Sequence, residues 1–126
     1  MKEDMSVYTG KQLDTAIIAK ALSHPARIAI LEYIIKNGGC CFTGINGCTS
    51  LAKSTTSRHI SELVNAGLIM GDGNSTRPKY CINKATMTKA RGLLSKVLNC
   101  DCDSNKVMEA QRGESNETQM LIKKHC

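Results

Sequence analysis

Apolar residues recur at helical spacing in several stretches of the chain, and each such stretch predicts a helix. In residues 12–24 the apolar positions that lie near one helical face are Leu13, Ile17 and Leu22. The apolar side of residues 24–39 is made of Ala26, Ile30, Leu31, Ile34 and Ile35. Pro25 stands in the first turn of this second helix, where its missing N–H costs nothing, and Gly38 with Gly39 ends it.

Two more stretches have the same periodicity, residues 53–67 and residues 84–99. The predicted inward positions of the first are Thr56, Ile60, Leu63 and Val64. Those of the second are Met87, Ala90, Leu94, Val97 and Leu98. Gly67 supplies a C-terminal stop for the first of these helices, because glycine readily adopts the left-handed conformation that ends many helices.

The segments between these helices are shorter and differ in pattern. Residues 40–52 predict a short helix that opens near Thr43, although Gly44 and Gly47 each cost roughly 1 kcal/mol relative to alanine inside a helix. That helix therefore needs tertiary support. Residues 68–83 contain two short extended runs around a turn rich in Gly, Asn and Ser, and this pattern predicts a β-hairpin.

The predicted order of elements is helix, helix, short helix, helix, hairpin and helix, which is the order of a winged helix-turn-helix. The expected fold class is mainly α with a small β-hairpin wing. After Asn99 the chain becomes polar and loses regular period, apart from a short helical pattern at residues 117–124. We therefore expect one folded domain in residues 1–99 and a polar, mobile tail in residues 100–126.

Composition limits the cellular setting. No apolar run reaches the roughly 18 residues that a membrane-spanning helix needs. The N-terminus also lacks the apolar middle of a signal peptide. We expect a cytoplasmic protein with no membrane partner. Its 7 cysteines should then stay reduced, so they are candidates for metal binding, redox sensing or simple burial.

The formal net charge of +6 is concentrated before the tail. Residues 100–126 contain four basic and five acidic side chains, which leaves −1 there and +7 in residues 1–99. Basic clusters are often only solvated surface, so geometry must decide whether an acidic polymer is the partner. Between positions 53 and 84 only Glu62 and Asp72 oppose five basic residues, a local charge of +3. The five are Lys53, Arg58, Arg77, Lys79 and Lys84.

A polar stripe runs along the predicted helix of residues 53–67. Its members, spaced i, i+3, i+4 and i+7, are Ser54, Ser57, Arg58 and Ser61. Small hydroxyls let a helix backbone approach the floor of the major groove, and an arginine can reach a guanine edge or a phosphate. An amphipathic helix often has such a face only for solvation, but this one lacks the usual Glu/Lys pairs. Arg77 and Lys79 near the hairpin tip stand where a wing would touch phosphates, so we predict DNA binding.

Three motifs together resemble one known family. "KALSHPARIAILEYI", "LAKSTTSRHISELVNAGLI" and "KYCIN" are similar to the ArsR/SmtB family of bacterial transcription regulators, over about residues 13–98. The resemblance implies a homodimer through the first and last helices, operator binding by the fourth helix and wing, and release when a metal or metalloid binds. By position, the residues that correspond to the family's recognition-helix motif are Ser54, Thr55, Ser57, Arg58 and His59. Those that correspond to its wing are Arg77 and Lys79. With Lys53 these residues form the predicted DNA-contact set.

The family also carries a Cys-x-Cys pair at the start of the short helix, whereas this chain has "GGCCFTG". Cys40 matches the first position, Phe42 stands at the second, and Cys41 lies between them. A helix would separate Cys41 from Cys48 by about 10 Å along its axis, whereas thiolates that share a metal each lie about 2.3 Å from it. The adjacent Cys40 and Cys41, and the pair Cys100 and Cys102 in the tail, can each supply two thiolates to a soft ion. The predicted ligands are therefore Cys40, Cys41, Cys100 and Cys102.

The remaining cysteines carry less information. Cys48 and Cys81 lie in or beside apolar patterns and are expected to be small buried residues, and Cys126 has no assigned role. Zinc-finger spacing is absent, so no metal is expected to be required for folding. Sulfur-only candidates favour arsenite, antimonite or a soft metal ion such as Cd(II), Pb(II) or Cu(I) as the inducer.

Two other functions fit the same residues. The thiols of Cys40 and Cys41, or of Cys100 and Cys102, could form a redox switch in a DNA-binding regulator. A winged-helix module that binds protein instead of DNA is the other alternative. No phosphate loop, paired carboxylates or Cys/His/Asp set indicates an enzyme. The main prediction is a sequence-specific DNA-binding repressor that leaves its operator when trivalent arsenic or another thiophilic ion binds.

Overall fold

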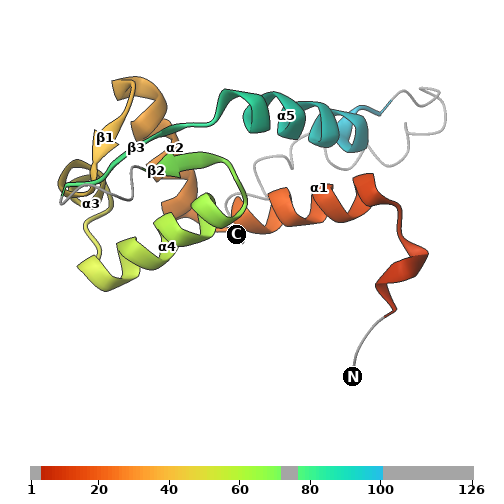
Figure 1. Cartoon of the computed structure of the whole chain (residues 1–126), viewed down its shortest axis with the longest axis horizontal. Coiled ribbons are helices and arrows are strands. Elements are labelled where there is room, and N and C mark those ends of the chain that lie inside the picture. The colour runs from red at the N-terminus through yellow and green to blue at the C-terminus, as the bar shows by residue number, and fades with distance from the viewer. Residues whose placement is uncertain (1–3, 72–76, 101–126) are drawn as a thin grey trace, which may run out of the picture. The chain divides into compact units, whose positions relative to one another are not determined.

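The structure is a computed structural model that describes residues 4–71 and 77–100, and it has the predicted order of elements (Figure 1). After a short 3-10 turn, η1 (Met5–Val7), the helices are α1 (Gly10–Ala21), α2 (Pro25–Asn37), α3 (Phe42–Thr49), α4 (Lys53–Asn65) and α5 (Lys84–Leu98). The strands are β1 (Cys40–Cys41), β2 (Ile69–Gly71) and β3 (Lys79–Ile82). The mainly helical fold with a small hairpin is thereby confirmed.

The chain divides into two units, Met1–Lys96 and Val97–Cys126. All elements up to β3 and most of α5 belong to the first unit. The predicted mobile tail and its short helix lie, apart from Cys100, outside the described residues. Within the described part, no helix is both long and apolar enough to cross a membrane.

The hairpin belongs to an antiparallel sheet whose strand order is β1-β3-β2. β2 and β3 pair Ile69 with Ile82, Met70 with Cys81 and Gly71 with Tyr80. On the other side of β3, Cys40 pairs with Tyr80 and Cys41 with Lys79. The sequence pattern does not predict β1, because a strand of 2 residues is too short to show an alternation.

The helix ends follow local side-chain chemistry. Thr9 caps α1 in a reciprocal arrangement with Gln12, in which each side chain bonds the other residue's backbone N–H. At the start of α2, Nδ1 of His24 accepts a hydrogen bond from the Ala26 N–H at 2.9 Å. Pro25 occupies the first turn, and Gly38 ends the helix with a φ of 70°. The predicted limits of α2 are confirmed.

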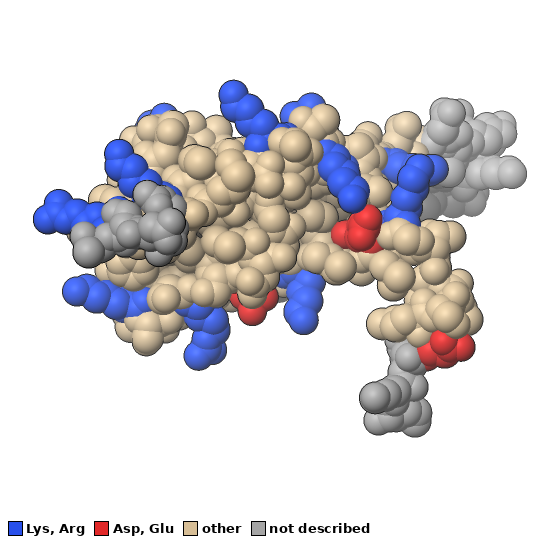
Figure 2. All heavy atoms as spheres, viewed as in Figure 1, with Lys and Arg blue, Asp and Glu red and all other residues tan. Residues whose placement is uncertain are grey.

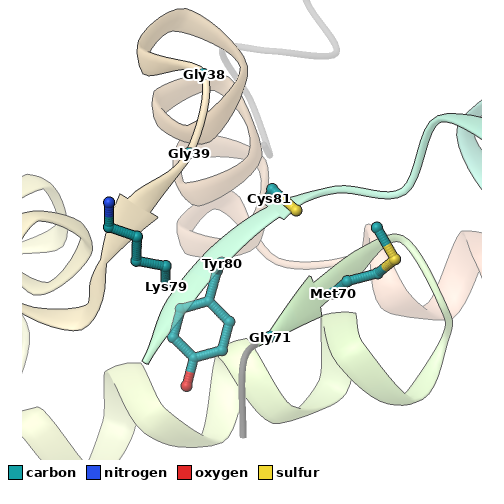
Figure 3. Close-up of a pocket in the computed structure, with 7 residues that line it drawn as sticks. All are labelled: Gly38, Gly39, Met70, Gly71, Lys79, Tyr80 and Cys81. Carbon is teal, nitrogen blue, oxygen red and sulfur yellow. The ribbon is translucent and has the colours of Figure 1, made fainter. Parts of the chain in front are cut away.

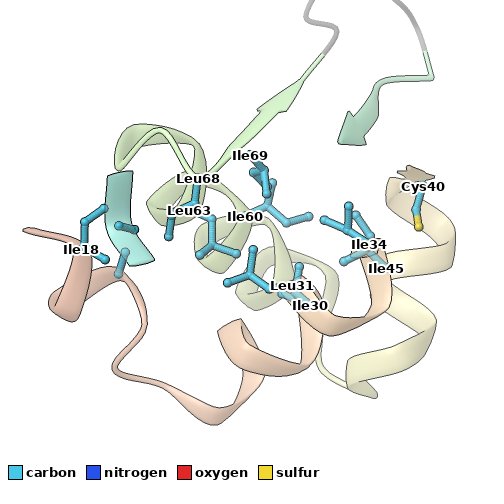
Figure 4. Packing of buried hydrophobic residues seen from close by; sticks show 12 residues of the cluster. Ile18, Ile30, Leu31, Ile34, Cys40, Ile45, Ile60, Leu63, Leu68 and Ile69 are labelled. Carbon is cyan, nitrogen blue, oxygen red and sulfur yellow. The ribbon is translucent and has the colours of Figure 1, made fainter. Parts of the chain in front are cut away.

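The hydrophobic core lies between α2, α3, α4 and the sheet (Figure 4). Its fully buried apolar side chains are Ile30, Ile34, Ile45, Leu63, Leu68 and Ile69. α1 adds Ile18 and Ala21, and α5 adds Ala90. On α4, Thr56, Ile60 and Leu63 are buried as the periodicity predicts, whereas Val64 is exposed and His59, which was not predicted to face inward, is buried.

Several apolar residues expected to face inward are exposed instead. Ile17 on α1 is 54% exposed and Ile35 on α2 is 56% exposed. Val97 and Leu98 at the end of α5 are exposed as well. These helices carry apolar residues on more than one face, so periodicity alone cannot decide which face meets the core. The prediction of inward positions was wrong at these residues.

Tertiary packing supports the glycine-rich helix α3. Ile45 at its centre is fully buried, and Tyr33 of α2 lies directly over Gly44. A Cβ atom at Gly44 would lie 3.1 Å from the Tyr33 hydroxyl oxygen. The two helices thus pack closely because Gly44 lacks a side chain, and this contact supplies the support that the sequence requires.

Candidate nucleic-acid interface

α4 turns its polar stripe to solvent and its apolar side to the core. The stripe residues Ser54, Ser57, Arg58 and Ser61 are all exposed. Lys53 is exposed beside them, and Thr55 is partly buried. Such a face, with small hydroxyls around one arginine, has the shape and chemistry to enter a major groove.

The start of α4 lacks any capping side chain. Its N-cap residue is Ala52, and the first turn contains no acidic residue. The first N–H groups of a helix have no partner within it, and they add to a partial positive charge at that end. A helix start of this kind attracts an anion such as a DNA phosphate, and Lys53 reinforces the attraction.

A hydrogen bond between the hydroxyls of Thr49 and Thr56 joins α3 to α4. The Thr49 hydroxyl donates to the Asn46 carbonyl oxygen at 3.0 Å, which uses its only proton. In the 3.1 Å contact between the Thr49 and Thr56 hydroxyls, Thr56 is therefore the donor. Thr56 is completely buried. Because this contact joins the two helices of the helix-turn-helix, it helps to decide which side of α4 faces outward.

His59 does not belong to the exposed face of α4, and its predicted contact with DNA is corrected. The side chain is 6% exposed, and its Nδ1 accepts a hydrogen bond from Nε of Arg27 at 3.1 Å. The rings of His59 and His24 lie 4.3 Å apart. Burial lowers the pKa of His59, and the positive charges of His24, Arg27 and Arg58 lower it further, while Glu62 acts in the opposite direction.

Arg27 joins three helices. Besides its bond to His59 on α4, its terminal nitrogen donates to the Lys20 carbonyl oxygen at 3.0 Å and to that of Ala21 at 3.4 Å. These carbonyls end α1, where the helix dipole favours a cation. The sequence did not predict this role of Arg27. It did contain a signal for the burial of His59, which lies three residues after Thr56 and four before Leu63, on the inward side of α4.

The hairpin presents the predicted wing residues to solvent. Arg77 and Lys79 are both exposed, whereas the turn at residues 72–76 lies outside the described residues. The Tyr80 ring lies against Gly71, where an added Cβ would be 2.7 Å from ring atom Cε1 (Figure 3). Lys79 also lines a hollow of 390 Å³ between the hairpin and the end of α2, and Figure 3 labels the residues that line it.

α4 and the hairpin lie next to each other. A hollow of 290 Å³ between them is lined by residues of both, including Ser61 and Val64 from α4 and Pro78 and Tyr80 from the hairpin. In Figure 2, Lys and Arg side chains project around the end of the molecule that holds α3, the start of α4 and the hairpin, with few acidic side chains in view. The exposed stripe and the basic hairpin can therefore meet one polyanion together.

The cysteines lie differently from what the sequence suggests. Cys40 is buried and Cys41 partly buried, and successive residues of a strand point to opposite faces of a sheet. The two thiols therefore do not face one common ion in this conformation. Cys48 and Cys81 are exposed, so the prediction of their burial was wrong. Cys81 lies with Lys79 on the exposed face of β3. Cys48 belongs to α3, in which Ile45 is the only buried residue.

The predicted metal ligands are only partly described. Cys100 is exposed, and Cys102 and Cys126 lie outside the described residues. Within the described ranges, no group of three or more His, Cys, Asp or Glu side chains could hold a metal ion. A site that combines Cys40 and Cys41 with Cys100 and Cys102 thus stays a prediction.

The thiols differ in acidity. Backbone N–H groups at the start of α3, above all that of Gly44, lower the pKa of Cys41, and the nearby Arg77 guanidinium contributes. Burial raises the pKa of Cys40, and its neighbours Cys41 and Cys48 add to the rise. Although Cys48 is exposed, neighbouring protein atoms keep part of the water away from its thiol, and this desolvation raises its pKa. Of these three thiols, Cys41 therefore has the strongest thiolate character.

Comparison with known proteins agrees with this geometry. Residues 24–70 match the family described as "Bacterial regulatory protein, arsR family". The match runs from the cap of α2 into β2 and includes the whole helix-turn-helix with its exposed stripe. Residues 24–70 thus match an ArsR-family helix-turn-helix domain. The chain is also 29% identical over 82 residues to the HTH-type transcriptional regulator YgaV of Escherichia coli (strain K12), with 65% of this chain and 83% of that protein covered.

Solved structures show the same fold. The crystal structure of an ArsR family transcriptional regulator superposes with a TM-score of 0.60 at 21% identity, covering 68% of this chain and 93% of the other. A homodimeric winged helix-turn-helix DNA-binding domain from Mycobacterium bovis gives a TM-score of 0.55 at 19% identity, covering 81% and 96%. The family and fold are those of DNA-binding transcriptional regulators and not of enzymes.

Proposed function

We propose that this ArsR-family regulator is a cytoplasmic, homodimeric repressor that binds a near-palindromic operator and leaves it when a thiophilic ion binds. The DNA-reading part rests on one observation above all. The exposed stripe of α4 begins at an uncapped, positively polarised helix end, and the basic hairpin lies beside it. No acidic side chain occurs in the first turn of α4 to repel a phosphate.

The residues of this face have different roles. Arg58 reads a base edge or a phosphate from the middle of the stripe, and the hydroxyls of Ser54, Thr55 and Ser57 allow close approach and add hydrogen bonds. Lys53, Arg77 and Lys79 contact phosphates, so they contribute affinity without sequence preference. His59 is not assigned a contact with DNA, because it is buried.

Salt-dependent binding to duplex DNA tests this part of the proposal. A duplex is first selected by binding from a random-sequence pool, and its affinity is compared with that of an unselected duplex. Phosphate contacts make the affinity for both fall steeply with salt, while base contacts preserve a preference for the selected duplex. Absence of binding to any duplex at low salt would instead favour a module that binds protein.

Dimerisation through α1 and α5 fits the exposed apolar residues of these helices. Ile17 on α1 is exposed, as are Val97 and Leu98 at the end of α5. Apolar residues in such positions often cover a partner surface. In such a dimer, residues 1–99 provide DNA binding and dimerisation, and residues 100–126 form a tail. The two recognition helices would then read half-sites about one DNA turn, roughly 34 Å, apart.

The proposed inducer is arsenite, antimonite or another soft ion, held by thiolates from Cys40, Cys41, Cys100 and Cys102. The chemistry of the donors supports this class, because thiolates select soft centres. Cys41 is partly exposed, whereas the side chain of Cys40 is buried in the core and would have to become exposed to take part. Because thiols must lose their protons before they can bind an ion as thiolates, the response should weaken as the pH falls.

Release from the selected duplex by a panel of arsenite and soft metal ions tests the inducer. Serine substitution of Cys41, or of Cys100 together with Cys102, should leave DNA binding intact and abolish release. Serine substitution of Cys48, which is exposed but lies outside the proposed site, is the matched control. Normal release from the Cys41→Ser variant would place the site elsewhere.

A redox switch is a second candidate function, favoured by the lowered pKa of the partly exposed Cys41. A thiol with more thiolate character reacts faster with peroxides and alkylating reagents. Mass spectrometry after mild peroxide treatment should then find Cys41 oxidised before Cys48, whose pKa is raised. If peroxide releases the DNA and arsenite does not, the redox function replaces metal sensing.

A further inference from the structure

The recognition helix is linked to α1 through Arg27 of α2, in addition to the apolar contacts of Ile18 and Ala21 with the common core. A hollow of 210 Å³ lies between the two helices, lined by Ile17, Lys20 and Ala21 of α1 and by Glu62, Asn65 and Ala66 of α4. Arg27 spans these elements, because its guanidinium bonds both to His59 on α4 and to the carbonyl oxygens at the end of α1. This side chain therefore contributes, with the core, to the position of α4 relative to α1.

We propose that Arg27 and His59 are positioning residues for operator recognition, and that protonation of His59 releases the recognition helix from α1. This inference rests on the proposed DNA interface and on dimerisation through α1. Neither residue touches DNA. Their hydrogen bond sets the tilt of α4 against the dimer helix, and through the twofold axis it sets the distance between the two recognition helices. A wrong distance weakens binding to a palindrome more than binding to unselected DNA.

The chemistry of the contact makes it sensitive to acid. Nε of Arg27 is always a donor, so Nδ1 of His59 must be an unprotonated acceptor with the ring neutral. An imidazolium has no acceptor and would place a second positive charge beside the guanidinium. The other groups that act on His59 are His24, Arg58 and Glu62, of which only Glu62 favours the charged ring. The contact thus exists only while His59 is neutral.

The direction of the pH effect follows from the same groups. The pKa of His59 is lowered from its ordinary value of 6.5, chiefly by burial. The contact is therefore complete above pH 6.5 and is lost as the pH falls through the lower pKa of the folded protein. Added positive charge alone would strengthen binding to DNA at low pH. Loss of the contact between Arg27 and His59 should instead weaken binding to the selected duplex at low pH.

The experiment measures the affinity of the full chain for a duplex selected at pH 7.5 and for an unselected duplex, between pH 7.5 and pH 5, by fluorescence anisotropy. The preference of the wild type for the selected duplex should fall at least about fivefold on acidification, the lower end of typical coupling between sites. His59→Asn places an amide oxygen near the position of Nδ1 and cannot titrate. It should keep the preference at pH 7.5 and lose its pH dependence.

His24→Asn is the matched control for the neighbouring ring. Asparagine is a good helix cap, so it can replace the bond from the Ala26 N–H while removing the other imidazole. This variant should still lose its preference on acidification, but at a higher pH than the wild type, because His24 no longer lowers the pKa of His59. If His24→Asn abolishes the response and His59→Asn does not, the assignment to His59 is overturned.

Arg27→Lys tests the positioning role independently of pH. A single ammonium cannot reproduce the bonds from Nε and the terminal nitrogen together. At pH 7.5 this variant should lose discrimination between the selected duplex and duplexes whose half-sites are moved by one base pair, while binding to unselected DNA is unchanged. Circular dichroism confirms that the variants are folded. Unchanged discrimination in folded Arg27→Lys would overturn the inference, and a wild type that binds no duplex would overturn the proposed function as well.

Discussion

At the scale of single residues, the proposed DNA-reading face depends on buried side chains that lie outside it. Thr56 of α4 is completely buried, and its hydroxyl donates a hydrogen bond to the hydroxyl of Thr49 on α3. On the same inward side of α4, His59 accepts from Arg27. Each contact fixes the rotation of α4, so each decides that Ser54, Ser57 and Arg58 point outward.

Replacement of Thr56 by valine keeps the shape of the side chain and removes the buried donor. Thr49 still donates to Asn46 and accepts from the Leu51 N–H, so no buried proton is stranded. We expect the free energy of unfolding to fall by about 1 kcal/mol, the typical contribution of a hydrogen bond. Urea denaturation measures this change, and Thr88→Val on the exposed side of α5 is the control. Equal stability of the two variants would show that the hydroxyl pair contributes nothing.

Lys79→Ala removes one proposed phosphate contact of the hairpin. It should weaken binding to selected and unselected duplexes alike and reduce the slope of log affinity against log salt by about 1. Lys36→Ala at the exposed end of α2 is the matched control and should leave the slope unchanged. A loss confined to the selected duplex would mean that Lys79 reads bases instead.

The sequence predicted the exposed stripe residues and failed at some of their neighbours for physical reasons. Regular spacing locates the two sides of α4, which is why Ser54, Ser57, Arg58 and Ser61 were placed correctly in solvent. His59 was assigned from the family motif, although its position between Thr56 and Leu63 indicated burial. The hydrogen-bond donor to His59, Arg27, is 32 positions away in the sequence, and no local pattern can reveal this contact.

At the scale of elements, α3 shows how packing overrides propensity. The sequence correctly located this helix near Thr43 in spite of its glycines, but it could not show what supports it. The support comes from Tyr33, whose hydroxyl covers Gly44. In the same way, β1 exists only because β3 offers it a partner, since two residues have no strand signal of their own.

The two glycines of α3 should therefore respond differently to substitution. A Cβ at Gly47 meets nothing within 4 Å, so Gly47→Ala should stabilise the protein by about 0.5–1 kcal/mol through helix propensity. Gly44→Ala should gain less or lose stability, because its Cβ would lie 3.1 Å from the Tyr33 hydroxyl. Thermal unfolding compares the two. The packing account is wrong if both substitutions stabilise equally.

At the scale of the whole molecule, the exposed apolar residues indicate assembly. The sequence assigned Ile17 and Ile35 alike to inward faces, and both are exposed to nearly the same extent, 54% and 56%. A single sequence cannot separate a core face from an interface, because both are apolar. The proposed dimer uses α1 but not α2, so the two isoleucines provide a matched pair.

Ile17→Lys should dissociate the proposed dimer, because it places a charge in the apolar contact between subunits. Ile35→Lys should leave the dimer intact, since α2 lies outside the proposed interface. Sedimentation velocity at micromolar concentration, without metal ions, measures both. A monomeric wild type, or equal dissociation by the two substitutions, would contradict the assignment of the dimer to α1 and α5.

The central claim is that the exposed face of α4 reads DNA sequence, and Arg58 tests it most directly. The measurement is the affinity of wild type and Arg58→Ala for the selected duplex and for a complete set of its single-base-pair variants. If Arg58 reads a base edge, the substitution should cost about 1–3 kcal/mol and relax the preference at one base pair in each half-site. An unchanged base-preference profile in a folded, dimeric Arg58→Ala protein would contradict the claim.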